Sequence, residues 1–360
     1  MALLLSCLSA CSSHPASPSP PDSAAPPISE QQVEAPAGIF ALDGAGGTFR
    51  DGNLVDRDFV SGYAWRYGWH LLEPTAGVYA FDPLDHILRA VEEKGQKLAW
   101  IIMPTGDSTP AVPDYVLQTS ATWTDALGQT QVLPWDPYML ERMGAFLQSA
   151  ANRPVPGTST PLRDHPALYA VSVTFPGLPN LAVRDGPRGS IVDIPGFSRE
   201  AFLDSVVAML SMAQQAFPRQ HHFCGLWKIR DDPEAGELWE ELQDRVLAEL
   251  PSTGFFQDNL AASRPCAGCE PLTGAPHVDF AAPLTRAQGL RYTGLQALTS
   301  WVEPFDSTKA EKVAYGTPMD GMAYALESFG TRYFEFYAKD LDQAEWQDQL
   351  RAWANSLAGE

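Results

Sequence analysis

The chain has 360 residues, of which 45% are hydrophobic and 19% are charged, as expected for a globular protein of one large domain or two ordinary ones. Lys and Arg number 24 against 44 Asp and Glu, a formal net charge of -20, so most of the surface would repel a nucleic-acid backbone. After the N-terminus, no apolar run reaches the roughly 20 residues that span a bilayer. The composition therefore argues against a nucleic-acid partner and against a spanning helix.

The first eleven residues, MALLLSCLSAC, form a short apolar run that ends in small residues and a cysteine. This pattern is typical of a bacterial export signal. The run has no Lys or Arg before it, which leaves open a start upstream of Met1, and a chance cysteine at the N-terminus is the alternative. Residues 8–11, LSAC, resemble the lipobox of bacterial lipoproteins. That resemblance implies lipidation of Cys11, and Ser12 after it implies sorting to the outer membrane.

Residues 12–37 are rich in Pro, Ser and Ala and show no hydrophobic periodicity. Such a composition predicts a disordered linker, with the folded domain over residues 38–360. The order of signal, linker and domain predicts an exported protein that touches the membrane only through its lipid. Its folded part would work in the periplasm or at the cell surface.

From residue 38 onward, short apolar and aromatic-rich runs alternate with longer amphipathic ones. This alternation predicts a parallel α/β fold. The eight expected strands cover residues 38–43, 60–66, 97–103, 168–175, 222–229, 253–259, 291–298 and 331–337.

Helix starts are marked by a capping residue, in most cases followed by proline. The helix that Asp82 is expected to cap should end at Gly95, and another should end at Gly330. A last helix is expected over residues 341–357, whereas the helices after the first and sixth strands have weak signals. The marked starts are Asp82-Pro83, Asp136-Pro137, Ser198, Asp232-Pro233 and Thr317-Pro318.

Eight strands with helices between them predict a single-domain (β/α)8 TIM barrel. A doubly wound open sheet is the alternative. It is disfavoured because no Gly-rich phosphate loop follows the first strand in the form that dinucleotide-binding proteins use.

Residues 66–102 read RYGWHLLEPTAGVYAFDPLDHILRAVEEKGQKLAWII. In the order and spacing of its Arg, Trp, Glu-Pro, Gly, aromatic and Leu-Asp positions, this segment resembles strands two to three of clan A-type (β/α)8 glycoside hydrolases. The closest resemblance is to the β-galactosidase-like and cellulase-like branches. DHPALYAVSVTFPG resembles the approach to strand four of these proteins, and GTRYFEFYAKD resembles the end of strand eight. The resemblance implies a carbohydrate ligand and no cofactor.

The same resemblance implies two catalytic carboxylates, at the ends of strands four and seven. Retaining glycosidases hold this pair about 5 to 5.5 Å apart. Here strand four ends in Thr174-Phe175-Pro176 and strand seven carries Gln296, so neither position supplies a carboxylate. Two alternatives follow: a glycoside hydrolase whose acids lie elsewhere, or a non-catalytic glycan-binding descendant that has lost the pair.

Other acids are candidates for the catalytic positions. On the last strand, alternation predicts that Tyr333, Glu335 and Tyr337 point into the barrel, where Arg66 would be the partner of Glu335. A purely structural buried Glu335 is the alternative. Asp258, at the end of the sixth strand, fits a site acid and a turn residue equally well. Glu335 and Asp258 are therefore the candidate catalytic residues, and an inverting mechanism could use such acids.

Two further acids, Asp107 and Glu303, lie in expected loops, where a cap and an exposed acid are the simpler interpretations. Flat aromatic rings bind the apolar faces of sugars, and three tryptophans lie near the carboxyl ends of expected strands. Core packing is the alternative for each of them. The expected substrate-binding residues are Arg66, Trp69, Trp227, Gln296 and Trp301.

The cysteines Cys266 and Cys269, in CAGC, could form a zinc half-site, a redox pair or a local disulfide. No second Cys pair and no nearby His pair completes a zinc site, so a disulfide or plain loop cysteines are favoured. The sequence also contains no Gly-x-Ser-x-Gly elbow and no P-loop. No metal site and no cofactor are expected.

Overall fold

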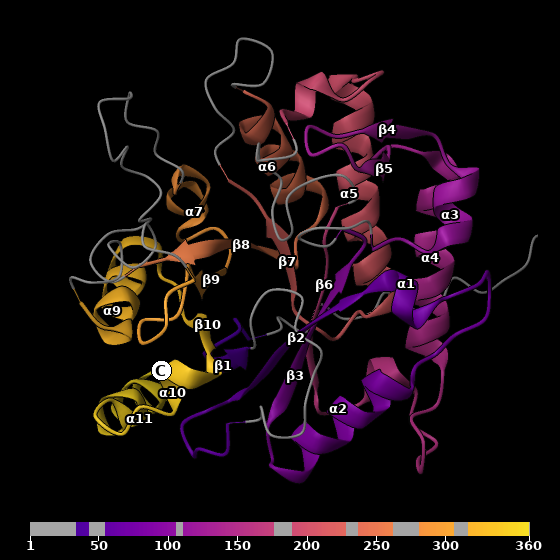
Figure 1. The fold of residues 1–360 in the computed structure, drawn as a ribbon. Coiled ribbons are helices and arrows are strands. Elements are labelled where there is room, and N and C mark those ends of the chain that lie inside the picture. The colour runs from indigo at the N-terminus through magenta and orange to yellow at the C-terminus, as the bar shows by residue number, and fades with distance from the viewer. Residues whose placement is uncertain are drawn as a thin grey trace, which may run out of the picture. The chain divides into compact units, whose positions relative to one another are not determined.

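The computed structural model describes residues 34–42, 55–105, 111–175, 189–227, 237–261, 281–305 and 316–359. Within this part, eight parallel strands form one sheet in the order β6-β3-β2-β1-β10-β9-β8-β7 (Figure 1). All eight strands coincide with the predicted ones, with ends that differ by a few residues. They are β1 (Gly38–Leu42), β2 (Gly62–Gly68), β3 (Lys97–Met103), β6 (Leu168–Val173), β7 (His222–Gly225), β8 (Thr253–Leu260), β9 (Thr293–Ala297) and β10 (Tyr333–Tyr337).

The two edge strands of this sheet, β6 and β7, meet and nearly close it into a barrel. A parallel bridge joins Ala170 to His221. The N–H of Val171 donates to the carbonyl of His221, and the N–H of His221 donates to the carbonyl of Tyr169, both over 3.0 Å. The predicted (β/α)8 barrel is thus confirmed. Because all eight strands are parallel, their carboxyl ends lie at one end of the barrel.

Helices flank the strands on the outside of the barrel (Figure 1). The longer ones are α2 (Asp82–Glu93), α4 (Pro137–Asn152), α5 (Arg199–Ala216), α6 (Leu238–Glu249), α9 (Pro318–Phe329) and α11 (Gln347–Ala358). The shorter pieces are α1 (Trp69–Leu72), α3 (Asp114–Thr119), α7 (Ala282–Ala287), α10 (Ala338–Leu341), the 3-10 turns Leu162–Asp164 and Ile191–Asp193, and the hairpin β4 (Thr122–Thr124) and β5 (Thr130–Val132).

Three of the predicted helix starts are confirmed by side-chain caps. Asp136, Ser198 and Thr317 accept hydrogen bonds from the backbone N–H groups of Met139, Ala201 and Asp320, respectively. Each cap satisfies one of the backbone donors that a helix leaves open at its N-terminus.

Two predicted helix starts were wrong. Phe81 rather than Asp82 occupies the N-cap of α2, so Asp82 lies inside the first turn and makes no capping bond. The last helix, predicted over residues 341–357, is present as α11 but begins only at Gln347, because Leu341 ends α10 and a turn lies between the two. The Asp232-Pro233 start lies outside the described residues.

Aromatic rings fill the amino-terminal half of the barrel interior. Phe40 of β1 stacks on Tyr169 of β6, with ring centroids 5.3 Å apart, and lies 4.7 Å from Tyr333 of β10. Phe223 of β7 lies 5.0 Å from Tyr333 and 5.7 Å from Phe256 of β8. These buried rings form one aromatic layer around Tyr333, which lies two residues before Glu335 on β10.

Gly294 of β9 makes room for this aromatic layer. A Cβ on Gly294 would lie 2.9 Å from the rings of Phe223 and Phe256. Two residues further along β9, on the same side of the strand, Gln296 pairs in register with Glu335 of β10. A polar layer therefore follows the aromatic layer toward the carboxyl ends of the strands.

The chain enters the barrel at its amino end. The N–H of Ala37 donates to the hydroxyl of Tyr169 over 2.9 Å, just before β1 begins. Ala37 closes the predicted linker of residues 12–37, of which only residues 34–37 belong to the described part. The rest of the linker and the predicted signal with Cys11 lie outside it.

Candidate functional site

Glu335 lies on the inner face of β10, at the carboxyl half of the barrel, and its side chain is only 2% exposed. Its Oε1 accepts a hydrogen bond of 2.9 Å from the hydroxyl of Tyr333. Its Oε2 lies 3.7 Å from Nη2 of Arg66, whose side chain is 6% exposed at the end of β2. The structure therefore brings together Glu335 and the Arg66 partner that the strand alternation predicted.

Burial raises the pKa of Glu335 from its ordinary value of 4.5 to about 7. The positive charge of Arg66 and the Tyr333 hydrogen bond oppose this rise, whereas the negative charge of Asp258 adds to it. A carboxyl group with a pKa near neutrality is protonated often enough to donate a proton and is regenerated easily. Glu335 thus has the properties of a general acid.

Asp258 lies near the end of β8 and is half-buried. Its Oδ1 accepts a hydrogen bond of 3.1 Å from Nε1 of Trp227, which follows the neighbouring strand β7 and is 9% exposed. Burial raises the pKa of Tyr337 to about 12, and the charges of Asp258 and Glu335 add to the rise, while Arg66 opposes it. The charge of Asp258 therefore acts on Glu335, and both acids act on the same tyrosine.

Buried polar atoms that make no hydrogen bond gather around Glu335. They are Nε and Nη2 of Arg66, Oγ1 of Thr174, Oε1 of Gln296 and Oε2 of Glu335, and other such atoms occur elsewhere in the described part of the chain. Their side chains come from β2, from the end of β6, from β9 and from β10, all near the carboxyl ends. Buried polar groups in folded proteins are nearly always hydrogen-bonded, so this cluster fits a site that binds a polar ligand.

A small pocket of about 20 Å³ opens beside Glu335. Small side chains make its space, because Ala99, Ala170, Ser172 and Gly225 line it together with larger rings. A pocket of this volume has room for about one water molecule. The space beside Glu335 is therefore small.

Trp69 does not face this site. Its ring is fully buried, packs 6.0 Å from Phe146, and donates a hydrogen bond of 3.0 Å from Nε1 to Oε2 of Glu73. Glu73 is itself fully buried, and its Oε1 accepts from the N–H of Gly77 and from Nη2 of Arg142, over 2.9 and 2.7 Å. Glu73 thus stabilises the turn after β2 and links it to α4. Trp69, which was expected in a ligand cleft, packs in the core instead.

Trp301 and Glu303 follow β9 and also lie outside the barrel interior. The Trp301 ring packs 5.9 Å from Phe336, which faces away from Glu335 on β10. The side chain of Glu303 is 75% exposed and forms an ion pair of 2.5 Å with Lys339. Both residues belong to the rim of the barrel, and Asp107 lies outside the described residues.

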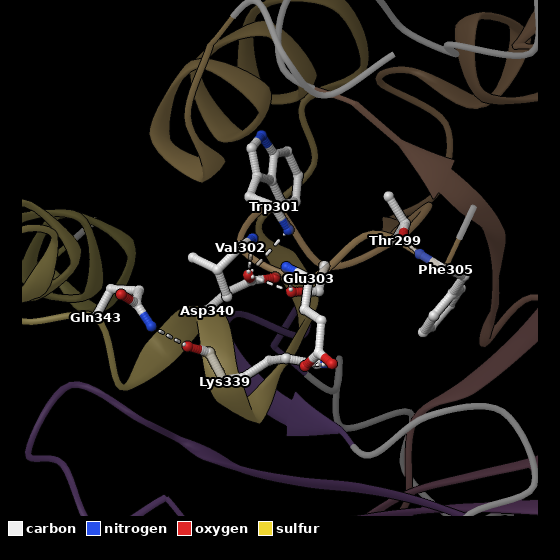
Figure 2. A network of polar contacts seen from close by, with 9 residues as sticks. Thr299, Trp301, Val302, Glu303, Phe305, Lys339, Asp340 and Gln343 are labelled. Carbon is white, nitrogen blue, oxygen red and sulfur yellow. Dashed lines mark hydrogen bonds and ion pairs between the residues drawn. The ribbon is translucent and has the colours of Figure 1, made fainter. Parts of the chain in front are cut away.

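Asp340 of α10 is a buried acid that the sequence did not single out. Its Oδ1 accepts hydrogen bonds from the hydroxyl of Ser300 and from the N–H groups of Trp301 and Val302, over 2.7, 2.9 and 3.1 Å (Figure 2). Burial raises its pKa to about 6, against the effect of these bonds. In the sequence, Asp340 lies where a surface helix is expected to begin. Its hydrogen-bond partners, about 40 residues earlier, become visible only in the fold.

The described part of the chain offers neither a metal site nor a membrane-spanning helix. No group of three or more His, Cys, Asp or Glu there is placed to hold a metal ion, and none of its helices has the length and apolar character to cross a membrane. Burial raises the pKa of the Cys224 thiol to about 12, so this thiol is unreactive near neutral pH. Cys266 and Cys269 lie outside the described residues.

Comparison with known proteins gives a likeness in fold. No protein-family profile matches the sequence, and no curated protein matches it in sequence. The catalytic domain of a β-amylase from Paenibacillus polymyxa aligns over 90% of this chain and 99% of its own, with a TM-score of 0.57 and 9% identity. It supports the (β/α)8 fold, which the resemblance to glycoside hydrolases implied.

Two xylanases align less well. A psychrophilic family 10 endo-β-1,4-xylanase covers 84% of this chain and 86% of its own, with a TM-score of 0.48 and 14% identity. Xylanase B from Clostridium stercorarium F9 aligns over 84% of this chain and 85% of its own, with a TM-score of 0.47 and 13% identity.

Proposed function

We propose that this protein is a glycoside-hydrolase-like protein that acts on a poly- or oligosaccharide at the carboxyl end of its barrel. The observation that carries the proposal is the cluster of buried polar atoms without hydrogen bonds around Glu335. Sugar hydroxyls both donate and accept hydrogen bonds, so one sugar ring could serve Arg66, Gln296 and Glu335 at once. The location agrees, because barrel enzymes build their active sites at this end.

In the proposed reaction, Glu335 is the general acid and Asp258 the general base of an inverting hydrolysis. Glu335 gives its proton to the glycosidic oxygen as the bond from that oxygen to the anomeric carbon breaks. Asp258 takes a proton from a water molecule whose oxygen bonds to the anomeric carbon from the opposite side. The proton then returns from Asp258 to Glu335 through solvent, and the carboxyls would need a separation of about 6.5 to 9.5 Å.

Arg66 and Tyr333 would support this acid. The Tyr333 hydroxyl fixes Oε1 of Glu335, which leaves Oε2 as the oxygen that faces a ligand. When Glu335 loses its proton, the Arg66 charge 3.7 Å from Oε2 stabilises the carboxylate that remains. Both residues are therefore positioning residues for Glu335 in this scheme.

A non-catalytic glycan-binding protein is the second candidate function. It is favoured by Phe175 and Gln296, which stand at the strand ends where the resemblance implies the two catalytic carboxylates. Such a protein would keep the site and its unpaired polar atoms but would not cleave the bond. Binding without turnover separates this function from the first.

The test is a panel of α- and β-linked glucans, xylans, mannans and galactans with detection of new reducing ends. Glu335→Gln and Asp258→Asn should each abolish turnover on any polysaccharide that the wild-type protein cleaves. Asp348→Asn is the matched control, because this fully exposed carboxylate lies on α11 and is expected to have no effect. Turnover that survives both site changes would overturn the assignment of the two acids.

We also propose that Cys11 carries the lipid of an outer-membrane lipoprotein, with the barrel in the periplasm or at the cell surface. The support is the LSAC sequence that ends at Cys11 and the linker that follows it. Labelling with a fatty-acid analogue in a bacterial host should modify the wild-type chain and not the Cys11→Ser variant. Equal labelling of both chains would contradict the proposal.

A further inference from the structure

The segment after β9, residues 299–305, is held in a fixed shape by Asp340. The Asp340 side chain has no exposed surface, and its Oδ1 accepts from Ser300, Trp301 and Val302 at once (Figure 2). Because the segment follows β9 and Asp340 follows β10, the contact lies at the carboxyl end of the barrel, the end of the candidate site.

Further hydrogen bonds within residues 299–305 close the segment on itself. The N–H of Glu303 donates to the hydroxyl of Ser300 over 3.1 Å, and the N–H of Phe305 donates to the hydroxyl of Thr299 over 3.0 Å. An ion pair of 2.5 Å joins Glu303 to Lys339. A segment ordered in this way loses little conformational entropy when it contacts a ligand.

The fixed segment presents apolar side chains to solvent. Phe305 is 46% exposed and Val302 is 41% exposed. The Phe305 ring stands edge-on to the ring of Tyr337, with centroids 5.0 Å apart and planes at 89°. Tyr337 lies two residues after Glu335 on the same face of β10. One buried ring thus separates the exposed Phe305 from the strand position of the proposed acid.

We propose that Phe305 is a stacking surface for a sugar ring next to the one at Glu335, and that Asp340 is the residue that positions this surface. The inference rests on the proposed function. Pyranose rings with equatorial hydroxyls have apolar faces that stack on flat aromatic rings. The surface would therefore bind the second or a later ring of a chain of such units, and it would not affect a ligand confined to the site at Glu335.

The first test compares Phe305→Ala with the wild-type protein by calorimetric titration of cellohexaose, xylohexaose, mannohexaose, maltohexaose and the matching monosaccharides. Leu290→Ala is the matched control, because this apolar side chain is 57% exposed before β9, at the amino end of the barrel. We expect the Kd for the bound hexasaccharide to rise about tenfold in Phe305→Ala and to stay unchanged in Leu290→Ala. Monosaccharide binding should be the same in all three proteins.

The second test concerns Asp340. Asp340→Asn keeps one oxygen that can accept the three hydrogen bonds, so it should retain the wild-type Kd, whereas Asp340→Ala should match Phe305→Ala. Ser300→Ala removes one of the three donors and should give an intermediate Kd if Asp340→Ala does not fold. Wild-type hexasaccharide affinity in both Ser300→Ala and Asp340→Ala would overturn the positioning role.

The outcomes separate the two proposals. If the wild-type protein neither binds nor cleaves any sugar of the panel, the proposed function fails. If the wild-type protein binds a hexasaccharide and Phe305→Ala binds it equally well, only the stacking surface is wrong. A loss of monosaccharide binding in Phe305→Ala would also contradict it, because that result places Phe305 at the first ring or in the fold.

Discussion

Nη2 of Arg66 lies 3.7 Å from Oε2 of Glu335, inside a barrel that hides both side chains from solvent. The separation exceeds that of a good hydrogen bond, so the guanidinium offsets only part of the desolvation of the carboxylate. The pKa of Glu335 therefore remains raised, and the pair should make the stability of the fold depend on pH.

Glu335→Gln should reduce the dependence of stability on pH. The pKa of Glu335 is about 7 in the folded protein and 4.5 in its ordinary state, so between these values the folded state holds a proton that the unfolded chain releases. The contribution to stability is present below pH 4.5 and is lost as the pH rises through 7. Urea unfolding at about pH 5 and about pH 8 should show a smaller decline in the variant than in the wild type. An unchanged decline would contradict the raised pKa.

Arg66→Gln should raise the pKa of Glu335 further. The Arg66 charge favours the ionised carboxylate, so its removal leaves only the Tyr333 hydrogen bond to oppose the effects of burial and of the Asp258 charge on the pKa of Glu335. An NMR titration of the Glu335 side-chain carboxyl carbon, assigned with Glu335→Gln, would measure the change directly in both proteins. A pKa that stays the same or falls would show that Arg66 does not act on this carboxyl.

Glu73→Gln should destabilise the fold without touching the proposed chemistry. Glu73 is fully buried and accepts three hydrogen bonds. The change removes the negative charge that faces Arg142 and replaces one accepting oxygen with a donor. Breaking a buried ion pair in this way lowers the free energy of unfolding by about 3 kcal/mol. Urea unfolding measures the loss, and a loss below about 1 kcal/mol would mean that the network contributes little.

Gly294→Ala should also destabilise the barrel, because the new Cβ would lie 2.9 Å from the rings of Phe223 and Phe256. Crowding of this kind costs about 1 to 3 kcal/mol in a packed core. Gly144→Ala is the matched control. Gly144 lies within α4, where alanine is the better helix former, and the new Cβ would meet only the flexible end of Met212 on α5. Thermal unfolding should show a lower melting temperature for the first variant and not for the second.

Much of this fold was predictable from local patterns. The eight strands stand out because short apolar runs alternate with amphipathic ones, and caps such as Asp136 and Thr317 act through neighbouring residues. Phe81 replaced Asp82 as the N-cap because the helix begins one residue earlier than the Asp-Pro signal suggests. The alternation of β10 was sufficient to place Glu335 inside the barrel.

The remaining features depend on tertiary packing. Arg142 reaches Glu73 from 69 residues away, and Asp340 collects donors from a segment some 40 residues earlier. Neither pairing leaves a local pattern, because each joins a helix to a loop far away in the sequence. For the same reason, the sequence could not decide that Trp69 packs in the core.

The bond between Ala37 and Tyr169 has a practical consequence. It fixes the start of the folded chain at the amino end of the barrel, whereas Glu335 and Phe305 belong to the opposite end. A purification tag, fluorophore or solid support joined ahead of Ala37 would approach the protein from the face that carries neither residue. Immobilised protein could therefore be screened against long, insoluble polymers with the carboxyl end of its barrel directed outward.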